Sequence, residues 1–409
     1  MSEQQLNEKA AVEKELAAKA DKISIIRLVD ALIIHAFESQ ASDIHIDPQE
    51  DKVRIRLRID GVLHDAFILP KEIQSEIISR IKVLSGLRTD EHQAAQDGRF
   101  KIPVKDIGYI DIRVSIAPTY YGENAVLRIL SERTQLNLDQ LGFSERDLKI
   151  VKSAVKKPYG MILATGPTGS GKTTTLYSII KELNTDEISI ITVEDPIEYS
   201  IKGIDQIQVN SKTGITFAQG LRSILRQDPN IIMVGEIRDE ETAGIAVNAA
   251  LTGHLMLSTI HTNDAATTLP RLLDMGIEPF LISSTVNIAI GQRLVRRLCP
   301  ECRVKKVLND AEFKSLTEVI KPEVLGKNRD FYESKGCQKC EDGYEGRFGV
   351  YEVLEVTDNI RELIVKRANS NIIAEAAKKE GMTTMLEDGF KKALAGITTI
   401  EEILRIVHE

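Results

Sequence analysis

The chain has 409 residues, of which 42% are hydrophobic and 28% charged, the composition of an ordinary globular protein with two or three domains. Its formal net charge of −8 and pI near 5.6 argue against a protein that binds nucleic acid directly. The sequence contains neither an 18-residue apolar run nor a secretory signal, so we expect a cytoplasmic protein without a membrane span.

The N-terminal part predicts a charged tail followed by a small sheet domain. Residues 1–21 are rich in Glu, Lys and Ala and are expected to form a solvated helix or a frayed tail. Residues 22–133 predict a mixed α and β domain. Apolar residues recur at helical spacing from Ile23 to Phe37, and a second helix is predicted over 71–87.

Arginines alternate with apolar residues along the predicted strands of this domain. Residues 53–59 read V-R-I-R-L-R-I, and Asp60-Gly61 predicts a tight turn into a hairpin partner. Two further strands carry Arg113 and Arg128 between apolar neighbours. The arginines either solvate the open face of an antiparallel sheet or present a cationic face to an anion.

A linker over 134–148 is followed by a predicted α/β domain over 149–295. Its wholly apolar runs alternate with helical segments, which is typical of a parallel sheet covered on both faces. These runs occupy residues 161–165, 188–193, 231–235 and 255–260. The alternation ends after this domain, and we expect a cysteine-containing module over 296–348 and a helical C-terminal region over 349–409.

A phosphate-binding loop follows the first apolar strand and reads G-P-T-G-S-G-K-T. Its glycines let backbone N–H groups surround phosphates, and the following helix N-terminus adds partial positive charge. Lys172 is expected to reach the β- and γ-phosphates of ATP, and the Thr173 hydroxyl to ligate Mg²⁺. The predicted nucleotide-binding residues are Gly166, Pro167, Thr168, Gly169, Ser170, Gly171, Lys172, Thr173 and Thr174.

Acidic residues follow two later strands, at the edge where a nucleotide binds in this kind of sheet. Glu236 has the Walker B position and is expected to hold Mg²⁺ directly or through water. Gly235 stands where many proteins of this fold carry Asp. Either Glu198 or Glu194 can polarise the attacking water. Asp239 is expected to be a helix N-cap.

Two arginines and two histidines lie near these acids in the sequence. A helix predicted over 216–227, capped by its first threonine, carries Arg222 and Arg226 on one face. They contact the γ-phosphate or another subunit, or they belong to a solvated face. His254 and His261 flank the strand over 255–260, where they are either structural or sense the γ-phosphate.

All four cysteines occur in two CxxC pairs, Cys299 with Cys302 and Cys337 with Cys340. In a cytoplasmic protein this pairing indicates a metal site rather than disulfides. Four thiolates form a closed tetrahedral site for Zn²⁺, so we expect the zinc to be structural.

Together these segments resemble the secretion ATPase superfamily, which includes the type II secretion and type IV pilus assembly ATPases. The resemblance covers nearly the whole chain from Ile23. The segments that carry it are 41–46, 56–61, 95–100, the phosphate loop, 193–199, 228–239, 252–265 and the cysteines.

The resemblance implies that the sheet domain is PAS-like and that the domain over 149–295 is a RecA-like P-loop ATPase domain, followed by a four-cysteine zinc module. It implies a homo-hexamer with nucleotide between the sheet domain and the RecA-like domain. It implies that Arg113 and Arg128 reach the phosphates. It assigns water activation to Glu198 and the Walker B role to Glu236. The arginines that it places near the site or the subunit interface are Arg222, Arg226 and Arg238.

The resemblance also implies a motor that hydrolyses ATP to drive pilus or pseudopilus assembly through an inner-membrane platform protein. Such a protein would be cytoplasmic and peripheral at the membrane through its partners. Because only some 20 residues precede the first helix, we expect a short form without the extra docking domain of longer relatives. Two alternatives stay open: a RecA-like nucleic-acid translocase, and a regulator that binds ATP without turnover.

Overall fold

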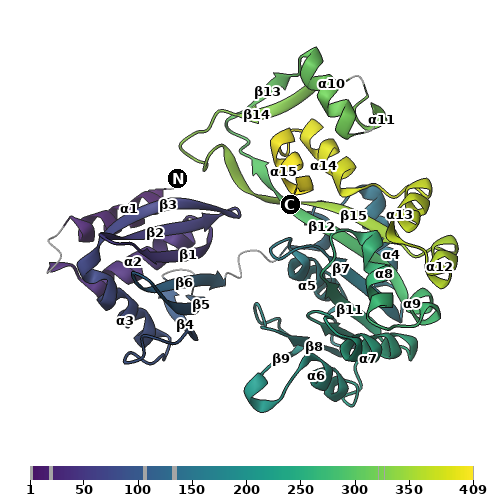
Figure 1. The fold of residues 1–409 in the computed structure, drawn as a ribbon, viewed down its shortest axis with the longest axis horizontal. Coiled ribbons are helices and arrows are strands. Elements are labelled where there is room, and N and C mark those ends of the chain that lie inside the picture. Colours follow the sequence, from purple (N-terminus) through teal and green to yellow (C-terminus); the bar gives the residue numbers. More distant parts are fainter. Residues whose placement is uncertain are drawn as a thin grey trace. The chain divides into compact units, whose positions relative to one another are not determined.

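The computed structural model describes residues 3–17, 22–104, 108–130, 136–320, 322–326 and 328–408. The chain forms two compact units (Figure 1). The first comprises Met1–Thr134 with Cys337–Glu341, and the second Gln135–Gly336 with Asp342–Glu409. Among the described helices, none is long and apolar enough to cross a membrane.

The first unit is built on a six-stranded antiparallel sheet in the order β3-β2-β1-β6-β5-β4. Its strands are β1 Ala41–Pro48, β2 Lys52–Ile59, β3 Val62–Pro70, β4 Gln96–Val104, β5 Gly108–Thr119 and β6 Gly122–Leu130. Its helices are α1 Glu3–Leu16, α2 Ile25–Glu38, η2 Lys71–Ile73 and α3 Gln74–Leu84. The apolar residues that alternate along the strands pack with α2 and α3 into one core.

The helix over 23–37 and the hairpin at Asp60-Gly61 are confirmed as predicted, the two turn residues having φ of 50° and 88°. Strand β4 was not predicted, because a glycine and a proline interrupt its pattern. The tail is more ordered than a frayed end: α1 packs on α2, and Val12 is fully buried there. Residues 1, 2 and 18–21 of that predicted tail lie outside the described residues.

The arginines of β2 have their charge balanced within the sheet. Arg54 lies 2.6 Å from Asp65, and Arg56 lies 2.7 Å from Asp47. The third arginine, at position 58, lies 3.6 Å from a nearly buried aspartate of β1. These three side chains therefore form ion pairs across strands, which favours the solvated-face interpretation for β2.

The second unit contains a seven-stranded sheet in the order β15-β12-β7-β11-β10-β8-β9. Strands β7 to β11 and β12 run parallel, and only β15 is antiparallel to its neighbour. The strands are β7 Gly160–Thr165, β8 Ile190–Glu194, β9 Asp205–Gln208, β10 Ile231–Val234, β11 Leu255–Ile260, β12 Val286–Leu298 and β15 Tyr344–Glu355. The four apolar runs are thus confirmed as strands of a parallel sheet.

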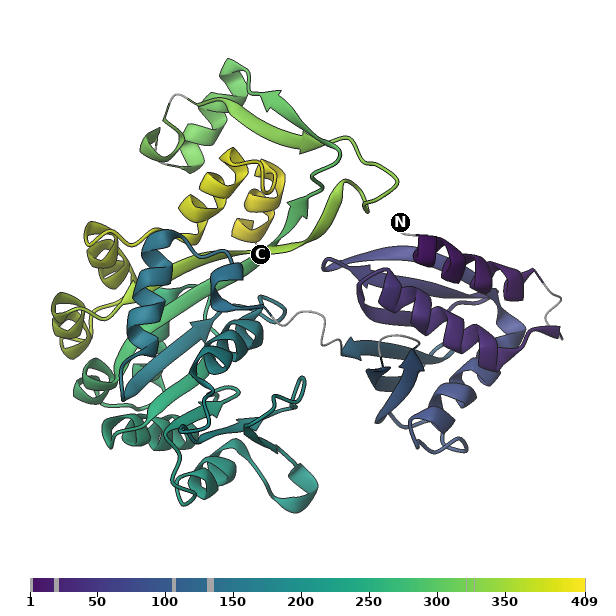
Figure 2. The same ribbon diagram turned by 180° about the vertical axis from the view of Figure 1, so that it is seen from behind.

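Helices cover both faces of this sheet, as the apolar runs predicted. On one face lie η4 Leu138–Gln140, α4 Glu145–Val155 and α5 Lys172–Leu183 (Figure 2). On the other lie α6 Phe217–Ile224, α7 Glu240–Leu251, α8 Ala265–Asp274 and α9 Pro279–Thr285. Neighbouring residues of β7 enter different cores: Met161 packs with α7 and α8, and Ile162 with α4 and α5.

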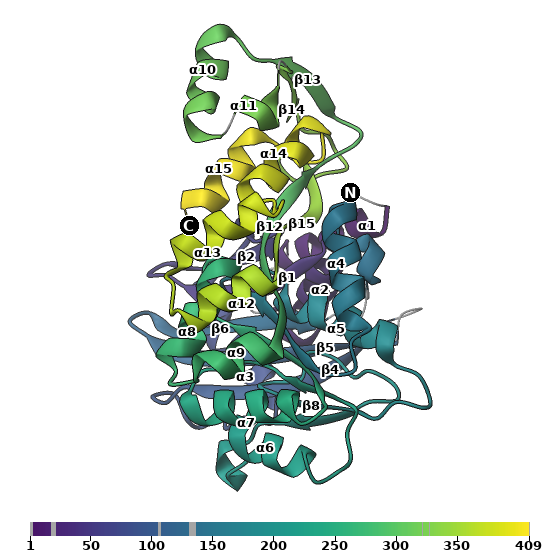
Figure 3. The ribbon, with the colours of Figure 1, turned by 90° about the vertical axis from the view of Figure 1, so that its right-hand side faces the viewer.

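The C-terminal part adds a small lobe and a row of helices (Figure 3). The lobe contains β13 Arg303–Val307, α10 Asp310–Val319, α11 Pro322–Leu325 and β14 Asp330–Ser334. The row contains α12 Asp358–Val365, α13 Ser370–Lys379, α14 Met385–Leu394 and α15 Ile400–His408. The predicted module boundaries at 295/296 and 348/349 fall inside β12 and β15, because these strands pair along most of their length.

Short 3-10 turns lie in the predicted linker and before α6. The predicted linker over 134–148 contains η4 and the start of α4, and its residues 134 and 135 lie outside the described range. A short 3-10 turn, η5 Ser211–Thr213, precedes α6. Thr216 caps α6, as predicted, by accepting a hydrogen bond from the Gln219 N–H.

A buried ion pair ties α3 to β6 in the first unit. The Lys82 side chain is fully buried, and its Nζ lies 2.7 Å from Glu123 Oε1 and donates to the Glu91 carbonyl at 2.5 Å. His92 Nδ1 lies 2.8 Å from the other oxygen of the same carboxylate. The loop after α3 is therefore fixed by one lysine.

We predict that Lys82→Met destabilises the protein by about 3 kcal/mol, because it leaves a carboxylate buried without its cation. The double variant Lys82→Met/Glu123→Leu should recover most of this loss, since no unpaired charge remains. Urea unfolding of the full chain measures both. A double variant as unstable as the single one would contradict the prediction.

Candidate functional site

The phosphate loop begins where β7 ends at the carboxyl edge of the sheet. Gly166, Gly169 and Gly171 have φ of 144°, 79° and 88°, a backbone region that favours glycine. A Cβ on Gly166 would lie 2.5 Å from the Gln292 carbonyl oxygen, so no larger residue fits. Helix α5 starts at Lys172, within the loop motif, which places backbone N–H groups of its first turn at the loop.

Lys172 is folded over the loop. Its Nζ donates to the carbonyl oxygens of Gly166 at 2.7 Å and Pro167 at 2.9 Å. Burial lowers its pKa to about 8, while the Glu236 carboxylate acts in the opposite direction. The Ser170 hydroxyl is buried and has no hydrogen-bond partner among the described residues. A buried ammonium, an unmatched hydroxyl and a helix N-terminus fit the phosphates of a nucleotide.

Gln292 of β12 makes hydrogen bonds to the phosphate loop and to α5, a role that the sequence did not predict. Its Nε2 donates to the Ser170 carbonyl at 2.8 Å, and its Oε1 accepts from the Thr175 hydroxyl at 2.9 Å. The side chain is fully buried and joins the loop to α5. A glutamine inside the apolar run of β12 was the available signal, because buried polar groups need partners.

Glu236 is nearly buried beyond the end of β10. Its Oε1 lies 2.5 Å from Arg238, and its Oε2 lies 3.0 Å from His261 Nε2. The negative charge of Glu236 acts to raise the pKa of Lys172, so this acid and the phosphate loop face the same region. A Cβ on Gly235 would lie 3.3 Å from the Val193 carbonyl, which leaves little room for the Asp found in other proteins of this fold.

The two other acids differ in their surroundings. Glu194 is buried and accepts hydrogen bonds from the Tyr177 hydroxyl, from Thr192 at 2.6 Å and from Gln206 at 3.1 Å. Burial raises the pKa of its carboxyl. Both oxygens are thus used to hold α5 and β9 against β8. Glu198 lies in the following loop and is half-buried.

The two histidines lie at opposite edges of the sheet. His261 follows β11 at the edge where the phosphate loop begins, and it contacts Glu236. His254 precedes β11, its carbonyl accepts from the Gly160 N–H, and its ring lies 3.0 Å from the Ala249 carbonyl. The structure does not bring His254 to the phosphate loop, because β7 and β11 run parallel and the whole length of the strand separates the two.

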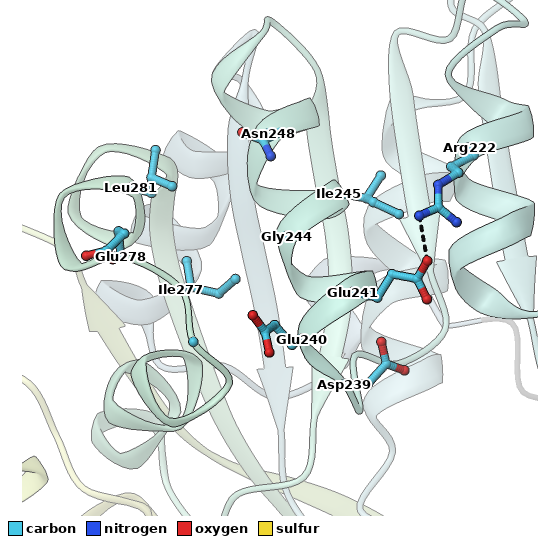
Figure 4. A pocket seen from close by; sticks show the side chains of 11 residues that line it. Arg222, Asp239, Glu240, Glu241, Gly244, Ile245, Asn248, Ile277, Glu278 and Leu281 are labelled. Carbon is cyan, nitrogen blue, oxygen red and sulfur yellow. Dashed lines mark hydrogen bonds and ion pairs between the residues drawn. The ribbon is translucent and has the colours of Figure 1, made fainter.

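The two arginines near α6 are exposed. Arg222 is exposed and donates to Glu241 at 2.5 Å, as Figure 4 shows. Arg226 is exposed beyond the end of α6. A shallow cavity of about 720 Å³ lies here between α6, α7 and α9, and none of its lining residues belongs to the phosphate loop. Asp239 caps α7 as predicted, accepting from the Thr242 N–H at 2.8 Å.

The other predicted arginines belong to the first unit. Arg113 of β5 and Arg128 of β6 lie opposite each other in the antiparallel register. Arg128 Nε donates to Asp43 Oδ1 at 2.9 Å, and the Asp43 side chain is nearly buried. The two guanidinium groups therefore lie on neighbouring strands of one sheet.

The four cysteines converge. The sulfur atoms of Cys299, Cys302, Cys337 and Cys340 all lie within 4.8 Å of one another. The first pair follows β12 and the second lies between β14 and β15, and the Cys299 N–H donates to the Gly343 carbonyl at 3.0 Å. Four thiols at this spacing fit a closed tetrahedral zinc site.

A buried carboxyl supports the loop that carries His261. Glu352 of β15 accepts a hydrogen bond at 3.0 Å from the N–H of Ala265, the first residue of α8. Burial raises its pKa to about 7, with the nearby Asp264 adding to the shift. The orientation of α8, and of the loop before it, therefore depends on a carboxyl that titrates near neutral pH.

Comparison with protein families matches residues 18–405 to the family described as "Type II/IV secretion system protein". The chain is 45% identical over 393 residues to the type IV pilus assembly ATPase PilB of Myxococcus xanthus, covering 95% of this chain and 69% of that protein. It is 46% identical over 399 residues to type II secretion system protein E of Pseudomonas aeruginosa, covering 97% and 78%.

Solved structures show the same architecture. A structure of the pilus retraction motor PilT with bound ADP matches at 28% identity and a TM-score of 0.62, covering 92% of this chain and 95% of that one. The Legionella pneumophila ATPase DotB matches at 22% identity and a TM-score of 0.70, covering 96% and 98%. The predicted α/β fold of sheet domain and P-loop ATPase domain is confirmed.

We predict that Cys337→Ser releases zinc and destabilises the C-terminal lobe, since three thiolates hold the ion less tightly than four. Metal analysis of the purified protein, with thermal melting, measures both effects. Lys335→Ala, which changes an exposed side chain two residues before Cys337, is the control. Wild-type protein purified without chelator and free of zinc would contradict the assignment.

We predict that Glu352→Gln gains stability relative to the wild type as pH rises. A carboxyl with a raised folded pKa contributes most below its unfolded value, and this contribution is lost as pH rises through about 7. The neutral amide has no such loss. Urea unfolding should show a relative gain of about 1 kcal/mol between about pH 6 and about pH 8. A difference independent of pH would refute this.

Proposed function

The chain belongs to the type II/IV secretion system protein family, and from this we propose that it is a hexameric motor ATPase for pilus or pseudopilus assembly. The observation that carries the proposal is the phosphate loop, with Lys172 buried over it and Glu236 facing the same region. That the chain is an ATPase follows from its family and from the relatives that it matches. The hexamer, the machine and the residue roles below are our proposals.

The loop binds the triphosphate of ATP through its backbone N–H groups and the Ser170 hydroxyl. On binding, Lys172 Nζ exchanges the carbonyls of Gly166 and Pro167 for β- and γ-phosphate oxygens, because charged acceptors bind an ammonium more strongly. Gln292 fixes the loop by donating to the Ser170 carbonyl. The sequence-predicted loop residues thus act together with one residue from a distant strand.

Magnesium, when bound, would neutralise charge that develops on the phosphates, and Thr173 and Glu236 are the residues that would hold it. Arg238 and His261 orient the Glu236 carboxylate from two sides. His261 is thereby placed to respond when a γ-phosphate enters.

We assign water activation to Glu198. Glu194 has both carboxyl oxygens committed to the Tyr177, Thr192 and Gln206 network, so its role is to hold β8 against α5. Glu198 follows it in the loop at the carboxyl edge, where an acid meets attacking water.

The arginines and partners complete the proposed motor. Arg113 and Arg128 supply positive charge to the phosphates from the sheet domain, and Arg222 and Arg226 contact a neighbouring subunit of the hexamer.

We place β12 and β15 in the ATPase domain, with the four-cysteine lobe as a structural zinc module. The motor works in the cytoplasm at the inner membrane, acting on a platform protein.

We predict that Lys172→Ala lowers ATP turnover by about 10²-fold or more, because the transition state loses a cation that stabilises its charge. Phosphate release is measured with the platform protein or lipid present. Lys181→Ala, an exposed lysine at the end of α5, is the matched control and should retain wild-type turnover.

Two outcomes would contradict this function. Equal and negligible turnover of wild type and Lys172→Ala, with nucleotide still bound, would indicate a regulator. Salt-sensitive DNA binding by the purified hexamer, with turnover stimulated by DNA, would indicate a translocase.

A further inference from the structure

The end of β11 carries hydroxyl side chains within an otherwise apolar strand. The Ser258 hydroxyl donates to the Val234 carbonyl at 2.8 Å, and the Thr259 hydroxyl donates to the Gly235 carbonyl at 2.8 Å. The Ile237 N–H in turn donates to the Thr259 carbonyl at 2.9 Å. These bonds attach the segment that bears Glu236 to β11.

A second set of hydroxyl bonds attaches β11 to the phosphate loop. The Thr165 hydroxyl donates to the Thr262 carbonyl at 2.8 Å, and the Thr262 N–H donates to the Thr165 hydroxyl at 3.1 Å. The two hydroxyl oxygens lie 2.5 Å apart, and the Thr268 hydroxyl lies 2.9 Å from that of Thr262. Each hydroxyl can donate once in this arrangement, so the group is internally satisfied.

The hydroxyl pair of Thr165 and Thr262 lies where β7 and β11 end and the site begins. The ladder between β7 and β11 ends at the pair Thr165 and Ile260. Thr165 directly precedes the first loop glycine, and Thr262 directly follows His261. The hydroxyl pair therefore extends the link between the two strands to the point where the phosphate loop and the His261–Glu236 contact begin.

We propose that Thr262, bonded to Thr165, is a positioning residue that fixes His261 and Glu236 relative to the phosphate loop. This inference rests on the proposed ATPase function and deepens it. Thr262 touches neither phosphate nor water in the proposed reaction. It sets the distance between two groups of residues that must act on the same γ-phosphate, and small displacements of such groups slow a reaction strongly.

The proposal separates binding from turnover. Lys172, the loop N–H groups and Gln292 hold the nucleotide without the hydroxyl pair, so KM should change little. Without the hydroxyl pair, Glu236 and His261 are no longer held at a fixed position relative to the phosphate loop, so kcat should fall. A residue that only stabilised the fold would lower the amount of active protein and leave the kcat of the folded fraction unchanged.

The experiment compares Thr262→Val with Thr262→Ser in the full-length protein. Valine removes the hydroxyl at nearly constant volume and should lower kcat by about 10-fold to 100-fold with KM within about twofold. Serine keeps the hydroxyl and should retain most of the wild-type kcat. The matched control is Thr285→Val, which removes a buried hydroxyl bonded within α9 to the Leu281 carbonyl and should leave kcat unchanged.

A double-variant cycle provides the second test. Thr165→Val removes the hydroxyl contact and also both bonds to the Thr262 backbone, so it should lower kcat at least as much as Thr262→Val. Thr165→Val/Thr262→Val should be no worse than Thr165→Val alone, because that single variant already breaks every bond of the pair. If Thr262→Val does not fold, judged by circular dichroism and gel filtration, Thr165→Val decides the matter.

Several results would overturn the inference. Wild-type kcat in Thr262→Val, equal loss in the control, or a parallel loss of affinity for a fluorescent ATP analogue would each do so. A wild type that binds the analogue without turnover would refute the proposed function itself. An active wild type with an indifferent Thr262→Val refutes only the positioning role.

Discussion

The carboxyl edge of the parallel sheet in the second unit is where ladder hydrogen bonds end and backbone groups need other partners. The fold meets this need with side chains. Gln292 bonds the Ser170 carbonyl, and Thr259 and Thr165 bond carbonyls of the neighbouring segments. The same groups that satisfy the backbone fix the loops in place. A site built on this edge is therefore rigid because unpaired polar groups are costly there.

Much of this architecture could be predicted from local pattern. Apolar runs marked the parallel strands, the spacing of glycines with Lys172 marked the phosphate loop, and short polar residues marked the caps Thr216 and Asp239. Each of these signals depends on neighbours within a few residues. The family resemblance extended the prediction to the sheet domain, whose own strands were only partly recognised from their alternation.

Contacts between residues distant in sequence determine the features that local pattern does not predict. The long β12 and β15 cross two predicted boundaries because they pair with each other across the intervening lobe. His254 was grouped with His261 by sequence spacing, although a strand separates the two edges that they occupy. Glu194 was grouped with Glu198, although the Tyr177 hydroxyl and its neighbours bind both of its oxygens. In each case the deciding partner is distant in sequence.

The charges of the phosphate loop explain why such a site favours an anion. Burial lowers the pKa of Lys172 to about 8, so its protonated form is less stable there than in water. Its ammonium donates to two backbone carbonyl oxygens, and the buried Ser170 hydroxyl lacks a partner among the described residues. A triphosphate supplies full negative charge and acceptor oxygens to both groups at once. In the proposed function, part of the free energy of nucleotide binding would therefore come from relieving a polar imbalance that the folded chain already contains.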